Sequence, residues 1–317
     1  MAEPRVGVLG ASSLVGRCVL TLLRAAGWQV VAFSRQPVVS TDGMEWRVLS
    51  PSPPAPAPRP TDRIAFRSGC EGGKLCVPNS PLAPRGERGV GHWICVAPLW
   101  VLPDYFSLIE ASGARRVVAL SSTSRFTKVG SGDTAENVVA AKLIDSEARV
   151  QAWAESHGIE WVILRPTLIY GHGRDKNISE IARFIRRFVF FPVLGQAEGL
   201  RQPIHAEDVA TACVSALQAP DAANHAYNIS GGETLSYREM VVRVFAALGR
   251  PTRLLTVPLW AFRLAVAMLR CLPRYRHWSE AMAERMNRDL VFDHTDAARD
   301  LGFKPRGFAL AAEDVPR

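Results

Sequence analysis

Short apolar runs alternate with amphipathic stretches along the first half of the chain. The runs are rich in valine, leucine and isoleucine. The stretches between them place apolar residues at helical spacing, as between residues 135 and 156, where Leu143 and Val150 fall near one face. Strands that alternate with helices in this way predict a parallel sheet. The predicted strands are 6–9, 29–33, 45–49, 93–97, 116–120 and 160–164, and the predicted helices are 17–24, about 103–112 and about 135–156.

The pattern becomes less regular after residue 165. We expect helices at 178–191 and 208–217, with the carboxylate of Glu207 or Asp208 as the cap of the second. A strand is predicted at 226–229, followed by a capping box of Ser236 and Glu239. The second half of the chain is therefore expected to mix elements of the sheet with a separate, smaller lobe.

Residues 51–91 interrupt the alternation at a point where a crossover helix would be expected. They contain nine of the 22 prolines, six glycines and almost no hydrophobic periodicity. Loops longer than about 12–15 residues are uncommon in compact domains. We interpret the stretch as a disordered insertion, with a solvated loop favoured over a partner-binding polyproline segment.

A glycine turn joins the first predicted strand to the first predicted helix. Gly10 follows the strand directly, Gly16 lies six positions later, and Ser13 stands between them where a second glycine would be expected. A strand, a glycine turn and a helix form the setting in which a dinucleotide phosphate meets the N–H groups of a helix N-terminus. The residues predicted to contact the cofactor here are Gly10, Ser12, Ser13, Leu14, Val15 and Gly16.

The composition is that of a globular protein, with 48% hydrophobic and 21% charged residues among 317. The formal charge is +8, but the arginines are scattered and no nucleic-acid-binding motif accompanies them, so no nucleic-acid partner is expected. The six cysteines form no CxxC pair and no Cys/His cluster with metal-ligand spacing. We expect reduced thiols, no metal and a cytoplasmic protein without a signal peptide.

The segment 254–272 is apolar, with Arg263 and Arg270 seven positions apart on one helical face. Two interpretations stay open. One is a helix of the smaller lobe packed on its core, which is favoured. The other is an interfacial helix in peripheral contact with a membrane.

Six motifs in order resemble the extended and atypical short-chain dehydrogenase/reductase superfamily, in particular its NAD-dependent epimerase/dehydratase branch. The glycine turn is the first. The resemblance covers roughly residues 5–35 and 93–310 and implies an α/β fold, namely a Rossmann-type doubly wound parallel sheet with a smaller C-terminal substrate lobe. The other motifs are Leu120–Ser124, the helix with Lys142 and Glu147, Leu164–Gly171, Arg201–Ala210 and Tyr227–Gly232.

The resemblance also implies a division of the chain and roles for single residues. Residues 1–170 would form the dinucleotide-binding domain, to which 205–230 return, and 171–204 with 231–317 would form the substrate lobe. Thr123 and Lys142 would be catalytic. Further cofactor contacts would come from Ser34, Arg35, Ala97, Ser121, Lys142, Pro166 and Thr167, and substrate contacts from Tyr170, Arg201 and His205.

One position departs from the family pattern. The family uses a tyrosine four residues before the lysine as its general acid or base, and that position here is Val138. Valine has no proton to give, and no tyrosine lies between Tyr105 and Tyr170. The residues considered as substitute proton donors are Tyr170, His172, Tyr105 and Lys128.

The end of the second strand predicts the cofactor type. An acidic residue there would bind the adenine ribose of NAD, but the chain has Phe33, Ser34 and Arg35. The guanidinium of Arg35 is suited to a 2′-phosphate, so NADP is predicted over NAD.

Two functions of different classes remain. The first is an NADP-dependent oxidoreductase or epimerase-like enzyme acting on a sugar nucleotide or another carbonyl or hydroxyl compound. The second is a protein that binds NADPH without turnover, as a sensor or a structural assembly subunit, which Val138 favours. We expect a small-molecule substrate and a monomer or homodimer.

Overall fold

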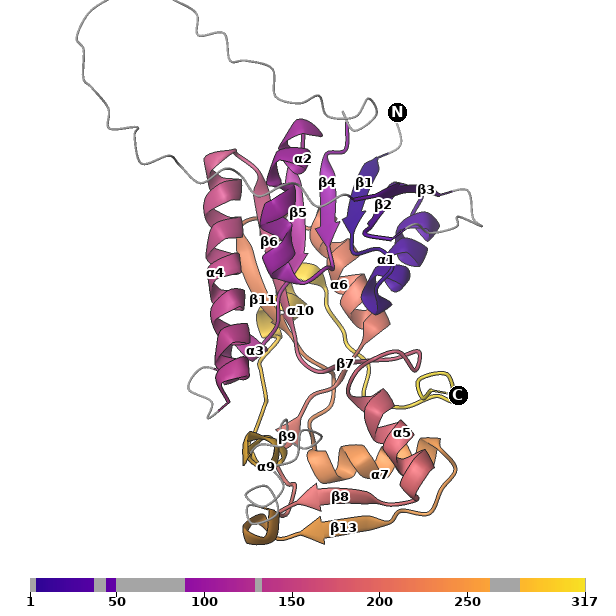
Figure 1. Cartoon of the computed structure of the whole chain (residues 1–317). Coiled ribbons are helices and arrows are strands. Elements are labelled where there is room, and N and C mark those ends of the chain that lie inside the picture. The colour runs from indigo at the N-terminus through magenta and orange to yellow at the C-terminus, as the bar shows by residue number, and fades with distance from the viewer. Residues whose placement is uncertain (1–3, 37–43, 50–88, 129–132, 263–279, 317) are drawn as a thin grey trace, which may run out of the picture.

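A seven-stranded parallel sheet forms the larger part of the molecule in the computed structural model, which describes residues 4–36, 44–49, 89–128, 133–262 and 280–316 (Figure 1). Its strand order is β11-β6-β5-β4-β1-β2-β3, and every neighbouring pair is parallel. The seven predicted strands are thereby confirmed to within a few residues. Their bounds are β1 Arg5–Leu9, β2 Gln29–Ser34, β3 Glu45–Val48, β4 His92–Cys95, β5 Arg116–Leu120, β6 Glu160–Pro166 and β11 His225–Ile229.

Helices cover both faces of this sheet, as a doubly wound fold requires. One hydrophobic core joins the sheet to α1, α6 and α10. A second core joins the other face to η1, α2 and α4. The central strands are buried on both faces, which explains why their sequences are continuously apolar rather than alternating. The bounds are α1 Leu14–Ala25, η1 Leu99–Tyr105, α2 Phe106–Ala111, α4 Thr134–Ser156, α6 Ala206–Gln218 and α10 Thr295–Leu301.

A smaller lobe follows the sheet and has a hydrophobic core of its own. Its strands pair in three two-stranded sheets, β10 with β7, β12 with β9, and β13 with β8. In Figure 1, β8 and β13 lie at the end of the molecule farthest from the seven-stranded sheet. The lobe elements are β7 Ile169–Tyr170, α5 Ile178–Phe188, β8 Phe191–Leu194, β9 Leu200–Arg201, β10 Ile204–His205, β12 Leu235–Ser236, α7 Tyr237–Ala247, β13 Leu254–Val257 and α9 Glu280–Asn287. Two short helices lie outside the lobe, α3 Ser124–Thr127 and η2 Pro220–Ala222.

The two predicted helix caps have different outcomes. Ser236 caps α7 as predicted, because its side chain accepts the N–H of Glu239 at 3.0 Å. The carboxylate cap predicted for α6 is wrong. The helix begins two residues earlier, and Nδ1 of His205 accepts the N–H of Glu207 at 3.2 Å.

The predicted helix at 254–272 is also wrong at its start. Residues 254–257 form β13, which pairs in parallel with β8, and helical backbone begins only at residue 259. Val257 and Phe262 pack with Leu194, so the start of the segment is part of the lobe. Within the part of the chain that the structure describes, no helix is both long and apolar enough to cross a membrane. Residues 263–272 lie outside the described residues, as do 50–88, which include most of the predicted insertion.

Candidate functional site

The turn between β1 and α1 is built so closely that only glycine fits at two positions. Gly10 has a φ of 81°, and a Cβ placed there would lie 2.6 Å from the backbone N of Ala97. A Cβ at Gly16 would lie 2.4 Å from the carbonyl oxygen of Gly10. Ala97, predicted as a cofactor contact, therefore lies directly beside the turn, where the end of β4 meets the start of α1.

Ser13 is the N-cap residue of α1. The helix begins at Leu14, three residues before the predicted start, and therefore closer to the turn. The Ser13 hydroxyl accepts the N–H of Gly16 at 3.0 Å and caps the helix. The N–H groups of Leu14 and Val15 belong to the first helical turn, where the intrahelical ladder supplies no acceptor. A phosphate at this point would meet those N–H groups and the positive end of the helix dipole. The residues present therefore fit the pyrophosphate of a dinucleotide.

The end of β2 lies beside the same turn. The hydroxyls of Ser34 and Ser12 are 3.5 Å apart, and the Ser34 hydroxyl also accepts the N–H of Gln36 at 3.3 Å. Arg35 is exposed, with its side chain free to reach a ligand on that edge. Tyr105 is buried nearby. Burial raises the pKa of its phenol, which the charge of Arg35 lowers in part.

The hydroxyl groups at the end of β5 are all bonded to the protein. Ser121 donates to the carboxylate of Glu147, and Thr123 Oγ1 donates to the carbonyl oxygen of Pro166 at 3.1 Å. Thr167, one residue beyond β6, donates to the carbonyl oxygen of Gln202. These contacts bring together Ser121, Thr123, Pro166 and Thr167, four of the predicted site residues, at the carboxyl ends of β5 and β6.

A buried carboxylate organises this edge of the sheet. Glu147 on α4 is 1% exposed and accepts from Ser121, from Arg125 and from Arg165, with Arg165 Nη2 2.7 Å from Oε2. A buried carboxylate is tolerated only when charged donors surround it, as these two guanidiniums do. The sequence pointed to Glu147 only as a neighbour of Lys142, and nothing in the pattern showed that it would be the central acceptor.

Helical geometry places Val138 and Lys142 away from this carboxylate. At about 100° per residue, Lys142 lies about 140° and Val138 about 180° around α4 from Glu147. Both side chains are exposed. The side of α4 that carries Glu147 also carries Glu136, Ala140 and Leu143, all of them buried. The structure therefore does not bring Lys142 to Ser121 or Thr123, and its predicted cofactor role stays a prediction.

The three predicted substrate residues lie inside the protein. Tyr170 packs edge-on against His205 and Phe308, and burial raises its pKa to about 12. Arg201 is 4% exposed, and its guanidinium donates to the carbonyl oxygens of Leu200, Arg285 and Arg288. Burial lowers the pKa of Arg201. As described, this guanidinium binds the backbone at the end of α9, so its predicted contact with an anionic substrate stays a prediction.

His205 links α6 to the C-terminal segment. Because its Nδ1 accepts the N–H of Glu207, the neutral ring carries its proton on Nε2, which lies 3.1 Å from Oδ1 of Asp314. Burial would raise the pKa of Asp314, but hydrogen bonds from His205 and from the N–H groups of Ala311 and His172 lower it to about 2.

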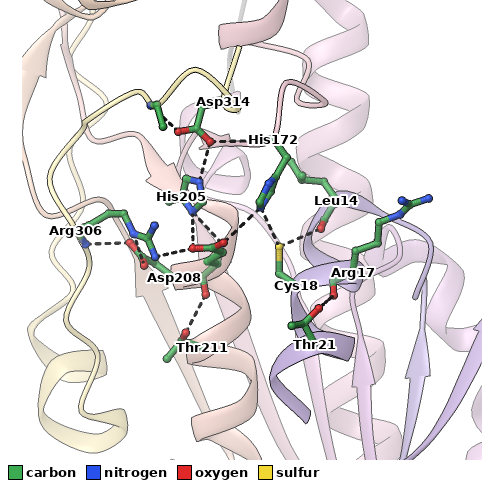
Figure 2. Close-up of polar contacts among 12 residues, drawn as sticks. Leu14, Arg17, Cys18, Thr21, His172, His205, Asp208, Thr211, Arg306 and Asp314 are labelled. Atoms are coloured by element: carbon green, nitrogen blue, oxygen red, sulfur yellow. Dashed lines mark hydrogen bonds and ion pairs between the residues drawn. The ribbon is translucent and has the colours of Figure 1, made fainter. Parts of the chain in front are cut away.

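A groove of about 750 Å³ runs between α1, α6 and the C-terminal segment. Figure 2 shows polar contacts among residues in and around this groove. His172 Nε2 lies 3.6 Å from the sulfur of Cys18 and 3.6 Å from the Glu207 carboxylate, which also pairs with Arg306 at 3.0 Å. In a catalytic triad, the histidine contacts the nucleophile through one ring nitrogen and the orienting carboxylate through the other. Here Nε2 of His172 faces both Cys18 and Glu207, so these three side chains do not form a triad. Burial, and then Glu207, raise the pKa of Cys18 and keep the thiol protonated.

The four substitute proton donors are dispersed. Tyr170 and His172 belong to the α1–α6 side, and Tyr105 lies near Arg35. Lys128 directly follows α3, on the segment that leaves Thr123, and its Nζ is 3.9 Å from Oε1 of Glu136. Among the described residues, no three His, Cys, Asp or Glu side chains form a group that could hold a metal ion.

The comparisons with known proteins agree with this geometry. Residues 105–230 match the NAD dependent epimerase/dehydratase family. The UDP-glucose 4-epimerase of Vibrio cholerae is 28% identical over 161 residues, which are 51% of this chain and 47% of that protein. The chain thus spans about half the length of this relative. The 2-alkyl-3-oxoalkanoate reductase of Stenotrophomonas maltophilia is 24% identical over 328 aligned positions and 95% of both chains.

A solved structure shares the whole fold. MoeE5 in complex with UDP-glucuronic acid and NAD superposes with a TM-score of 0.65 and 20% identity over 98% of this chain and 95% of that chain. The glycine turn and the Rossmann-type sheet show the fold, and over residues 105–230 the chain is similar to the NAD dependent epimerase/dehydratase family.

Proposed function

We propose that the chain binds NADP(H) at the β1–α1 turn and acts as an oxidoreductase or epimerase-like enzyme on a sugar nucleotide or another carbonyl or hydroxyl compound. The observation that carries the proposal is the backbone cradle at Gly10 and Gly16, which no side chain could share. The relatives named above, a sugar-nucleotide epimerase and a keto-acid reductase, support the substrate class.

Arg35 supports NADP as the cofactor. Its exposed guanidinium follows β2, on the edge where the adenine ribose is held in folds of this type. A planar fork of donors fits a 2′-phosphate, whereas NAD needs a carboxylate for the ribose hydroxyls. Leu14, Val15 and Ser13 at the start of α1 would hold the pyrophosphate, and Ala97, Pro166 and Thr167 would border the rest of the cofactor.

The bound nicotinamide would supply the hydride chemistry. The residues of this chain would orient the substrate, because the end of β5 is fixed by Ser121, Thr123 and the Glu147 network. The proton would come from outside α4, since the side of α4 that carries Glu147 presents Ala140 and Leu143 and no phenol. Lys128 is the substitute donor closest along the chain to Thr123 and is the first residue to test.

A second function is supported by one observation. Val138 stands where the family pattern has a tyrosine, so α4 provides no phenol at that position. A protein with an intact phosphate cradle and no such phenol is suited to hold NADPH without turnover, as a sensor or an assembly subunit.

One experiment separates the two functions. NADPH and NADH binding are measured by fluorescence titration. Turnover by the wild type and Lys128→Met is then followed as NADPH oxidation with a panel of 3-oxo acids, and by product analysis with a panel of UDP-sugars, whose epimerisation consumes no net NADPH. Binding with turnover that falls in Lys128→Met supports the enzyme and Lys128 as its donor, and turnover unchanged in the variant supports the enzyme alone. Binding without turnover supports the second function, and absence of binding contradicts both.

A further inference from the structure

The end of the lobe formed by β8 and β13 exposes large apolar side chains. Trp260 is 71% exposed, more than any other exposed large hydrophobic residue that the structure describes. Leu255 on β13 is 53% exposed, and Leu259 lies one residue before Trp260. A tryptophan in this position leaves an extensive apolar surface in water, which marks candidate interaction surfaces.

Arginine side chains accompany this apolar surface. The N–H of Phe191 donates to the carbonyl oxygen of Arg253 at 2.9 Å, so Arg253 lies beside the segment that leaves α5. At the end of α5 the Arg187 guanidinium lies 5.5 Å from the ring centre of Phe188, which is also exposed. We define the lobe-end surface by these residues: Arg187, Phe188, Arg253, Leu255, Leu259 and Trp260.

The sequence around this surface carries charge of one sign. The described residues 240–262 contain three arginines and no aspartate or glutamate. Arg243 pairs with Glu233 and Glu239, and Arg253 is an exposed member of the lobe-end surface together with Arg187.

We propose that the lobe-end surface docks peripherally on an anionic lipid membrane. Tryptophan is the residue that anchors proteins at the headgroup level, where its ring is apolar and its N–H meets water. Arginines near an anionic leaflet add about 1 kcal/mol of attraction each. In Figure 1, β8 and β13 lie at the end of the molecule opposite the seven-stranded sheet, so docking through that end would leave the glycine turn in solvent. The proposal is independent of the reaction.

Cosedimentation with vesicles tests it on the full chain. We expect the wild type to bind vesicles of equal parts phosphatidylcholine and phosphatidylglycerol, to bind phosphatidylcholine alone much less, and to dissociate as salt is raised. Trp260→Ala should lower the partition coefficient about tenfold, since the apolar area of the ring is lost. Arg187→Ala with Arg253→Ala should lower it by roughly fivefold for each arginine.

Matched controls come from the part of the molecule that contains the seven-stranded sheet. Trp100→Ala removes an exposed tryptophan of η1, and Arg115→Ala removes an exposed arginine beside β5. Both should bind like the wild type, and thermal unfolding shows whether each variant is folded. Equal losses in the controls, equal binding to both kinds of vesicle, or no binding would overturn the proposal. So would a change of oligomeric state in Trp260→Ala without a change in vesicle binding, because the surface would then cover a second copy.

Discussion

The two ends of the predicted cofactor cleft differ in which part of the chain forms them. At the β1–α1 end the backbone itself forms the site, and Gly10 and Gly16 leave no room for another residue type. At the α4 end the site depends on side chains, and the two that the family pattern requires, at positions 138 and 142, face solvent. Backbone cradles persist with the fold, whereas side-chain chemistry can be lost without altering it.

The largest expected effect concerns the carboxylate that organises the α4 end. Glu147→Ala leaves the guanidiniums of Arg125 and Arg165 without their shared acceptor, and removal of one partner from a buried ion pair costs about 3–5 kcal/mol. Urea unfolding measures the loss. Asp145→Ala, an exposed position on the same helix, is the control. A loss no greater than that of the control would show that the α4 end does not depend on this network.

The next effect tests the opposite end. Gly16→Ala forces a Cβ against the carbonyl oxygen of Gly10, which should cost about 1–3 kcal/mol and lower NADPH affinity at least about tenfold as the turn shifts. Gly91→Ala is the matched control, because the nearest atom to its new Cβ is a side-chain carbon of Arg115 at 3.9 Å. Fluorescence titration and urea unfolding are measured together. Unchanged NADPH affinity in a folded Gly16→Ala would mean that the turn does not hold the cofactor.

A pH-dependent effect is expected on the C-terminal segment that flanks the α1 end. The pKa of Asp314 is about 2 in the folded protein and near its ordinary value when unfolded, so its ionised form contributes about 2 kcal/mol at neutral pH. Because the folded pKa is the lower one, this contribution is lost as the pH falls from about 4 toward 2. The difference in unfolding free energy between the wild type and Asp314→Asn should shrink over that range. A difference that stayed constant with pH would refute the assignment.

A smaller effect separates the two cofactors. Arg35→Asp should weaken NADPH at least about tenfold and change NADH little, because the guanidinium would be paired with the 2′-phosphate alone. Arg24→Asp, on α1, is the control for a change of charge. Equal losses of both cofactors would leave Arg35 as an ordinary surface residue and remove the case for NADP.

Much of the fold follows from the sequence because it rests on local patterns. The parallel strands are buried on both faces, so continuous apolar runs in the sequence predict them. The three-residue spacing between Ser236 and Glu239 is enough to predict that Ser236 caps α7. The prediction of a helix at the start of β13 is wrong because a short apolar run fits both structures. The pairing of β13 with β8 depends on residues about 60 positions away in sequence.

In the candidate site, too, the features set by local sequence could be predicted, whereas those set by long-range contacts could not. Gly10 and Gly16 were identified because the turn needs glycine at fixed positions. Lys142 was chosen by its place in a motif, but which side of α4 faces the sheet depends on Glu147, Arg125 and Arg165, whose contacts span about 20 residues of sequence. The bond that His205 donates to Asp314 likewise joins residues 109 positions apart, although its cap of α6 is a local contact with Glu207.

We propose that the backbone of the β1–α1 turn supplies most of the affinity for the dinucleotide, and that Lys142 on the exposed side of α4 adds little to it. NADPH titration of the wild type against Lys142→Ala tests this most directly. We expect the wild type to bind and the variant to bind within about twofold of it, as for a surface substitution. Failure of the wild type to bind NADPH, or a loss of about tenfold or more in Lys142→Ala, would contradict the account.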